Sequence, residues 1–189
     1  MFRAVALKPV VSKSKIKDLK WFLIVPLCLI LSVNACKDEA IESKIPKIEF
    51  NSVSVYKDIR SRDSMVVLQI SYEDGNGDIG LSEGDTFPPF NYGNTAFYNL
   101  FVSYYVKTGN VFQKIVYPST SDTIHFNQRF PTLNFSSKEK KVSGIMDLRI
   151  PASPYPGINP TAVKFRISML DKSLNHSNEV ESGEIALQH

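Results

Sequence analysis

The chain has little of the chemistry that enzymes and metal centres most often use. Its 189 residues include two cysteines, three histidines and one tryptophan. It contains no His-Glu-x-x-His pair, no Cys-x-x-Cys pair and no phosphate-binding loop. A zinc centre, a redox-active dithiol and a nucleotide-binding P-loop are therefore not predicted.

The sequence after residue 36 also lacks the apolar spacing of a helix. No stretch there repeats apolar residues at i, i+3, i+4 and i+7 over three turns, whereas many stretches alternate polar and apolar residues. The alternation predicts strands that begin near residue 45 and continue at 64–73, 98–107, 111–116, 123–130, 144–150, 162–170 and about 180–187. Seven or eight short strands between turn signals predict an all-β fold, a single antiparallel β-sandwich of immunoglobulin or fibronectin III type.

The first predicted strand carries an irregularity. Ile48 and Phe50 share one phase of the alternation, and Val53 and Val55 share the other. The phase slips by one residue near Asn51-Ser52, which predicts a β-bulge or a strand that changes sheets.

No apolar run is long enough for a comfortable membrane span. The longest extends from Trp21 to Val33, and a spanning helix needs about 20 residues. Six Lys or Arg and one acid precede this run, and Asn34-Ala35-Cys36 follows it. These features are typical of a secretory signal peptide over residues 1–35. Residues 33–36 resemble a bacterial lipobox, in which the cysteine is lipidated after cleavage.

Cys36 is therefore predicted to become the lipidated first residue of the mature chain. Cys28 lies inside the apolar run and would be removed, so no pair remains for a disulfide. A lone N-terminal cysteine fits an acyl (palmitate-type) acceptor, and several acyl chains on one residue anchor stably where one is marginal. Two alternatives stay open. One is an uncleaved anchor helix, against which Pro26 and Asn34 argue, and the other is cleavage without lipidation.

The basic character of the whole chain belongs to this leader. The chain has 22 basic and 19 acidic residues and a net charge of +3. Removal of six basic residues and one acidic residue leaves 16 basic and 18 acidic, a net charge of −2. No nucleic-acid partner is therefore predicted. Residues 36–44 are expected to form a flexible acidic tether, and residues 45–189 the sandwich domain.

The most unusual loop places oxygen-bearing side chains at alternate positions between glycines. Asp74, Asn76 and Asp78 can converge on one point, as oxygen ligands of Ca²⁺ do. An EF-hand is excluded because Ile79 stands where that loop requires glycine, and because no helices flank it. The alternative is a Gly-rich connection whose polar side chains bond the backbone. The full candidate metal set is Asp74, Asn76, Asp78, Asp85 and, if two loops lie at one end, Asp171.

Residues 80–84, Gly-Leu-Ser-Glu-Gly, match the Gly-x-Ser-x-Gly nucleophile elbow. That chemistry requires a strand, a turn and a helix, followed by an acid and a histidine. Asp85-Thr86-Phe87-Pro88-Pro89 follows instead, which does not easily begin a buried helix. No catalytic residue is predicted, and the chain is interpreted as not being an enzyme, with a hydrolase acting through Ser82 as the opposing hypothesis.

Residues 88–97, PPFNYGNTAF, form a long loop rich in aromatic residues and glycine. Loops of this kind carry binding functions on sandwich scaffolds. Phe90, Tyr92 and Phe97 are therefore candidate ligand-binding residues that can stack on a sugar or dock a protein partner. The alternative is that they cover the end of the core.

Residues from about 66 to 187 resemble a family of uncharacterised Bacteroidetes lipoproteins. The residues that carry the resemblance are Asp74 to Leu81, Asp85-Thr86, Pro88-Pro89-Phe90, Tyr98 to Phe101, Gly144 and Asp171 to Asn178. The family usually has aspartate at position 76, so Asn76 lowers the charge of a cation site by one. The acidic cluster Lys37-Asp38-Glu39 resembles a signal for display on the outer face of the outer membrane. The resemblance implies a location and a fold, but no activity.

These observations predict a non-catalytic lipoprotein anchored in the bacterial outer membrane and facing outward. It would act as a binding or structural module for an envelope protein. The alternative is a glycan-binding accessory lipoprotein that uses the aromatic loop. No cofactor is required by either interpretation, and Ca²⁺ is the one candidate.

Overall fold

The computed structural model describes residues 43–117, 120–133 and 141–189. Residues 1–42 lie outside the described residues. They include the predicted leader, Cys36 and most of the predicted tether, which therefore stay predictions. Within the described part of the chain, no helix is long and apolar enough to cross a membrane.

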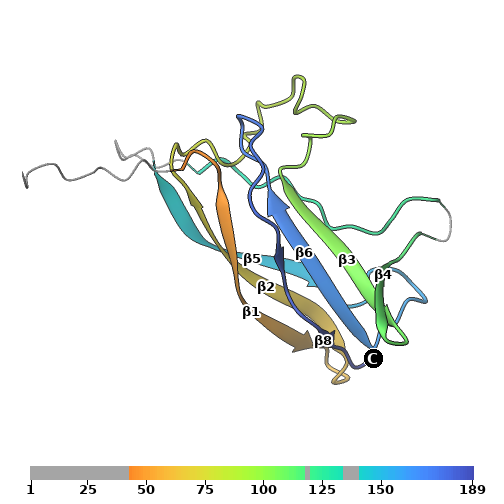
Figure 1. The fold of residues 1–189 in the computed structure, drawn as a ribbon. Coiled ribbons are helices and arrows are strands. Elements are labelled where there is room, and N and C mark those ends of the chain that lie inside the picture. Colours follow the sequence, from red (N-terminus) through yellow and green to blue (C-terminus); the bar gives the residue numbers. More distant parts are fainter. Residues whose placement is uncertain (1–42, 118–119, 134–140) are drawn as a thin grey trace, which may run out of the picture. The chain divides into compact units, whose positions relative to one another are not determined.

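Two antiparallel sheets make up the described residues (Figure 1). One sheet has the order β1-β2-β5, with β1 at Lys47–Lys57, β2 at Asp63–Asp74 and β5 at Val142–Pro151. In the other, β4 (Val111–Lys114), β3 (Leu100–Thr108) and β6 (Ala162–Met169) lie in that order, and both β7 (Val180–Glu181) and β8 (Ile185–Ala186) pair with β6. The predicted all-β sandwich of the immunoglobulin or fibronectin III class is confirmed.

Alternation along the strands builds one core between the sheets. Val66, Leu68 and Ile70 of β2 are fully buried, as are Phe165 and Ile167 of β6. They belong to a single hydrophobic cluster. Burial of such a side chain stabilises the fold by about 1.5–3 kcal/mol, so the period-two pattern holds the two sheets together.

The strands depart from the predictions in two places. The expected strand at 123–130 is a chain of isolated bridges from Thr123, His125 and Gln128 to neighbouring segments. The expected last strand is interrupted at Gly183, where φ is +72°, so β7 and β8 pair separately with β6. The irregularity predicted in β1 is confirmed, because the register with β2 shifts between Phe50 and Ser52.

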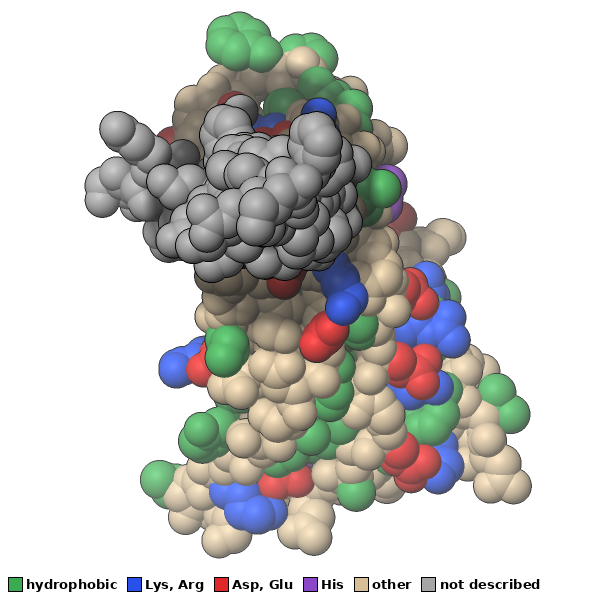
Figure 2. Space-filling view, turned by 60° about the vertical axis from the view of Figure 1, so that its left-hand side comes forward, with side chains coloured by type: hydrophobic (Ala, Val, Ile, Leu, Met, Phe, Trp, Pro, Cys, Tyr) green, Lys and Arg blue, Asp and Glu red, His purple; other side chains and the backbone are tan. Residues whose placement is uncertain are grey.

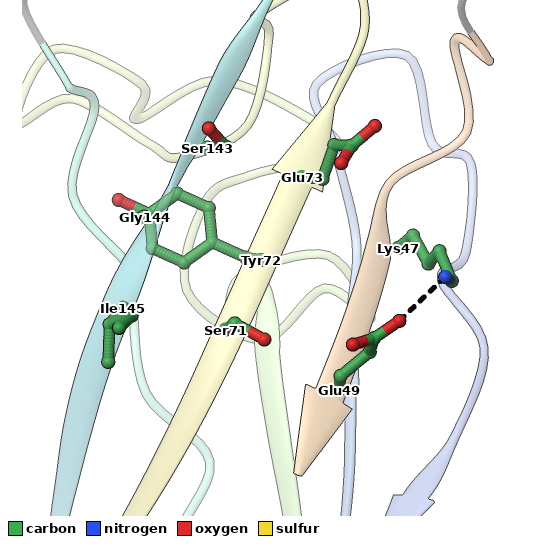
Figure 3. Close-up of a pocket in the computed structure, with 8 residues that line it drawn as sticks. All are labelled: Lys47, Glu49, Ser71, Tyr72, Glu73, Ser143, Gly144 and Ile145. Atoms are coloured by element: carbon green, nitrogen blue, oxygen red, sulfur yellow. Dashed lines mark hydrogen bonds and ion pairs between the residues drawn. The ribbon is translucent and has the colours of Figure 1, made fainter. Parts of the chain in front are cut away.

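Gly144 has a packing role in the β1-β2-β5 sheet. It lies opposite Tyr72, and Figure 3 shows the Tyr72 ring lying across it. A Cβ atom at position 144 would lie 2.5 Å from the Tyr72 hydroxyl oxygen. The same ring contacts Phe130 edge to face, with centroids 5.2 Å apart. Glycine therefore leaves the space that Tyr72 fills.

Candidate cation and ligand sites at the loop end

One end of the sandwich collects its longest connections, visible above β3 and β6 in Figure 1. We call this the loop end and define it as residues 74–99, 127–133 and 170–178. Two isolated bridges join its segments, Ile79 to Asp171 and Leu81 to Pro131. Gly80 has a φ of +96°, and a Cβ atom there would lie 2.3 Å from the Pro131 carbonyl oxygen. The loop can pass this close to residues 130–132 only because position 80 is glycine.

Three carboxylates meet at the loop end. One oxygen atom from each of Asp74, Asp78 and Asp171 lies within 4.8 Å of the others. Asp74 is 0% exposed and Asp171 is 1% exposed. Asp74 is the last residue of β2, and Asp171 follows β6 by two residues, so the cluster lies where the ends of the two sheets meet. The sequence analysis included Asp171 only on the condition that two loops lie at one end. The structure meets this condition, because Asp171 lies beside the loop at 74–78.

The hydrogen bonds of this cluster are incomplete. Asp74 Oδ2 accepts a bond from the Ile79 amide at 3.1 Å. Both Asp171 oxygens accept bonds from Asn175, at 2.7 and 2.8 Å, and Asp78 Oδ2 accepts one from the Ser173 hydroxyl at 2.5 Å. Three buried oxygens have no partner among the described residues: Asp74 Oδ1, Asn76 Oδ1 and Asp78 Oδ1.

The electrostatic environment disfavours the ionised form of Asp74. Burial raises the pKa of the Asp74 carboxyl above its usual value, and the negative charges of Asp78 and Asp171 raise it further. The Ile79 amide, which donates to Asp74 Oδ2, opposes the rise. The cluster thus concentrates like charges in a place shielded from water.

Asp85, also a candidate ligand, does not belong to the cluster formed by Asp74, Asp78 and Asp171. Asp85 Oδ2 accepts bonds from the Ser82 amide at 2.6 Å and the Ser82 hydroxyl at 2.8 Å. It also pairs with Lys172 Nζ at 2.9 Å. These bonds, with Lys172 contributing most, lower the pKa of Asp85 to about 2. The sequence spacing could not show this, because the deciding lysine is far along the chain.

Ser82 itself contacts an aspartate, not a histidine. Its hydroxyl donates to Asp85, while the histidines make their contacts elsewhere. His125 lies beside the Tyr98 ring, His176 stacks on Phe101, and His189 contacts Ser153 and Pro160. The nucleophile-elbow interpretation gains no geometric support.

The predicted aromatic residues surround one hollow of about 460 Å³. Phe90 and Phe97 are half-buried, and Tyr92 is 84% exposed, its ring packing edge to face on Phe97 with centroids 5.3 Å apart. None of the three packs against the hydrophobic core, so the core-covering alternative loses support. The full lining is Glu83, Asp85, Thr86, Phe90, Asn91, Tyr92, Phe97 and Arg129.

Arg129 holds this hollow together, and sequence reasoning missed it. Its guanidinium donates to the backbone carbonyls of Phe97 at 2.8 Å and Phe90 at 3.0 Å. The other terminal nitrogen donates to the carbonyls of Asp85 at 3.1 Å and Ser82 at 3.3 Å. The charged group also lies 5.0 Å from the centre of the Phe97 ring. One side chain thus fixes four points of the loop.

A second hollow, of about 450 Å³, is lined by polar and charged residues such as Asp58, Arg62 and Asn159 and lacks an aromatic cluster. A shallow hollow of about 270 Å³ lies over β1, β2 and β5 (Figure 3). Its charged groups are paired, Lys47 with Glu49 at 2.7 Å and Glu73 with Lys141 at 3.1 Å. On the face shown in Figure 2, basic and acidic side chains are intermixed and form no patch of one sign. The loop end is therefore the strongest candidate site.

Comparison with protein-family models, curated proteins and solved structures finds no match for this chain. The resemblance to Bacteroidetes lipoproteins stays a prediction.

Proposed function

We propose that the chain is a non-catalytic, lipid-anchored envelope protein whose loop end binds a ligand. The observation that carries this proposal is the hollow lined by Phe90, Tyr92 and Phe97 and fixed by Arg129. A loop held at four carbonyls loses little conformational entropy on binding, which favours affinity. An exposed tyrosine at its rim supplies a large contact surface at low entropic cost.

The shape and chemistry of the hollow favour a glycan over a protein partner. Its volume of about 460 Å³ lies within the range of about 300–1,000 Å³ that is usual for small-ligand pockets. Aromatic faces can stack on the apolar faces of sugar rings, and the Glu83 carboxylate and Asn91 amide, which also line the hollow, can bond hydroxyl groups. The alternative of the sequence analysis, a glycan-binding accessory, therefore becomes the first proposal here.

A glycan array probed with the purified protein tests this proposal. Tyr92→Ala should lower binding at least about tenfold, because stacking on an aromatic face would be lost. The matched control is Tyr56→Ala, which removes a tyrosine that is 58% exposed near the far end of β1. Equal binding by the two variants, or no glycan bound by the unchanged protein, would contradict the proposal. Binding of an envelope protein through the same residues would favour the partner hypothesis instead.

The proposed anchor is supported by the sequence of residues 1–36 alone. Lipidation at Cys36 would anchor the sandwich outside the cytoplasm, and the resemblance of Lys37-Asp38-Glu39 to a display signal is the basis for proposing the outward face of the outer membrane. Mass spectrometry of the membrane-extracted protein should find residue 36 acylated and residues 1–35 absent. Cys36→Ser should abolish acylation, whereas Cys28→Ser should leave it unchanged, because Cys28 would be removed with the leader. A chain that retains residues 1–35 would overturn the proposed anchor.

A further inference from the structure

We infer that Asp74, Asn76, Asp78 and Asp171 form a Ca²⁺ site that joins the ends of the two sheets. The site would form whether or not the loop end binds a glycan, because none of its four residues lines the aromatic hollow.

The backbone places the three carboxylates for a common ligand. Asp74 ends β2, and Asp171 follows β6. The Lys172 amide donates to the Asp78 carbonyl at 3.2 Å, and Ile79 forms an isolated bridge with Asp171. The segments at 74–79 and 171–172 are thus fixed side by side by backbone bonds. A cation between them would bridge one strand from each sheet.

The unpartnered oxygens point to a ligand independently of the acidic cluster. Asp74 is completely buried, yet its Oδ1 has no hydrogen-bond donor among the described residues. The Oδ1 atoms of Asn76 and Asp78 also lack a partner and are buried, although these two residues are only half-buried. Each buried polar atom left without a partner costs about 1–3 kcal/mol. Three such oxygens close together in the chain are explained if all three bind one cation.

The donor set selects a hard divalent cation. All four groups offer oxygen, and neither histidine nor cysteine is among them, which disfavours Zn²⁺. The three carboxylate oxygens are no further apart than 4.8 Å. Ligands on opposite sides of Ca²⁺ lie about 4.6–5.2 Å apart, whereas those of Mg²⁺ lie about 4.0–4.2 Å apart. This upper limit admits Ca²⁺. Mg²⁺ usually keeps several water ligands and is seldom held by an all-protein cage, so a site of four side-chain oxygens favours Ca²⁺.

Hydrogen bonds already made by the cluster do not block coordination. Asp171 accepts two bonds from Asn175, but each carboxylate oxygen has a second lone pair. Those bonds fix the carboxylate in place, as supporting bonds do around metal ligands. Three carboxylates against one divalent cation leave a net charge of −1, in place of −3 when all three are ionised without a cation.

Calorimetry and thermal unfolding of the full chain in detergent test the inference. After removal of metals with a chelator, CaCl₂ should bind with one ion per chain. At a Ca²⁺ concentration of 100 times Kd, the melting temperature should rise by about 5–10 °C. MgCl₂ at the same concentration should raise it less. Absence of both heat and a shift in melting temperature at 10 mM Ca²⁺ would overturn the site.

Two substitutions and a control locate the ion. Asp78→Asn, at a half-buried loop position, should weaken Ca²⁺ binding at least about tenfold. Asp74→Asn should do the same, and Asp78→Asn keeps the test valid if that variant does not fold. Asp147→Asn, on the exposed side of β5, is the matched control and should bind as the unchanged chain does. Equal affinity in all three variants would assign the ion elsewhere and overturn the inference.

Discussion

The two ends of β2 carry the same residue type in opposite circumstances. Asp63 begins the strand and is 8% exposed, and Asp74 ends it and is 0% exposed. Asp63 accepts bonds from Lys57 Nζ and from the Gln188 amide, each at 2.7 Å. Asp74 accepts the Ile79 amide on one oxygen, and its other oxygen has no partner among the described residues.

The pKa values of the two carboxyls move in opposite directions for that reason. The hydrogen bond from Lys57 lowers the pKa of Asp63, whereas burial and two like charges raise the pKa of Asp74. At the start of the strand, the charge of Asp63 is balanced by Lys57. The loop end gathers negative charge without an equal supply of cations, so a ligand is best sought there.

The largest expected effect comes from the glycine that shapes the loop end. Gly80→Ala should lower the free energy of unfolding by at least about 3 kcal/mol, because the added Cβ meets the Pro131 carbonyl and the φ is positive. Gly183→Ala is the matched control, with a φ of +72° and open space around it. It should lose only about 1–2 kcal/mol. Urea unfolding measures both, and equal losses would show that the approach to Pro131 is not tight.

Asp63→Ala should remove about 2 kcal/mol from the free energy of unfolding, since it leaves the Gln188 amide without its acceptor. The loss should be the same in chelator and in Ca²⁺, because the hydrogen-bond partners of Asp63 are Lys57 and Gln188 and no metal ion is proposed at that end. Asp74→Asn should instead have the same free energy of unfolding in chelator and in Ca²⁺. That value should equal the free energy of unfolding of the unchanged protein in chelator. A calcium-dependent effect at Asp63 would break the comparison between the two ends.

The sequence predicts the sandwich because side-chain alternation along strands is a local property. The clear strands at 64–73 and 162–170 correspond closely to β2 and β6. The register shift after Phe50 was also visible as a slip in phase. The split at Gly183 was missed, although the apolar residues change phase between Val180 and Ile185 and glycine in a strand is a signal for such a break.

The candidate site was predictable only where it is local. Asp74 and Asp78 lie four residues apart, so their convergence follows from the loop itself. Asp85 was assigned to the same site because it is near in sequence. In the structure it pairs with Lys172 instead, and this pairing depends on the fold. Arg129 left no signal at all, because its four acceptors are backbone carbonyls. Backbone acceptors have no sequence signature.

Acid titration distinguishes Asp85, which is paired with Lys172, from the carboxylate cluster of Asp74, Asp78 and Asp171. Asp85 has a pKa of about 2, below that of an unfolded chain. Its contribution to stability is therefore present above about pH 4 and is lost as the pH falls toward 2. The contribution should be about 1 kcal/mol after solvent screening. NMR titration of the carboxyl carbon measures the pKa, and Lys172→Ala should raise it toward 4. An unchanged value would show that the ion pair is absent in solution.

The smallest effect is expected at a second kind of unpartnered oxygen. The Tyr104 hydroxyl is buried and has no hydrogen-bond partner in the described residues, but its ring lies among apolar neighbours, 5.5 Å from both Phe126 and Phe165. It is neutral, since burial raises the pKa of the phenol further above its usual value. A single neutral oxygen in apolar surroundings gathers no cation, whereas Asp74 lies with two more carboxylates.

Tyr104→Phe should therefore change the free energy of unfolding by less than about 1 kcal/mol, since it removes an unsatisfied group and keeps the ring. The change should be identical in chelator and in Ca²⁺, measured by urea unfolding. A loss above about 2 kcal/mol would mean that a buried water satisfies the hydroxyl. The same explanation would then have to be tested for Asp74 Oδ1, where the calcium dependence of stability distinguishes a water from an ion.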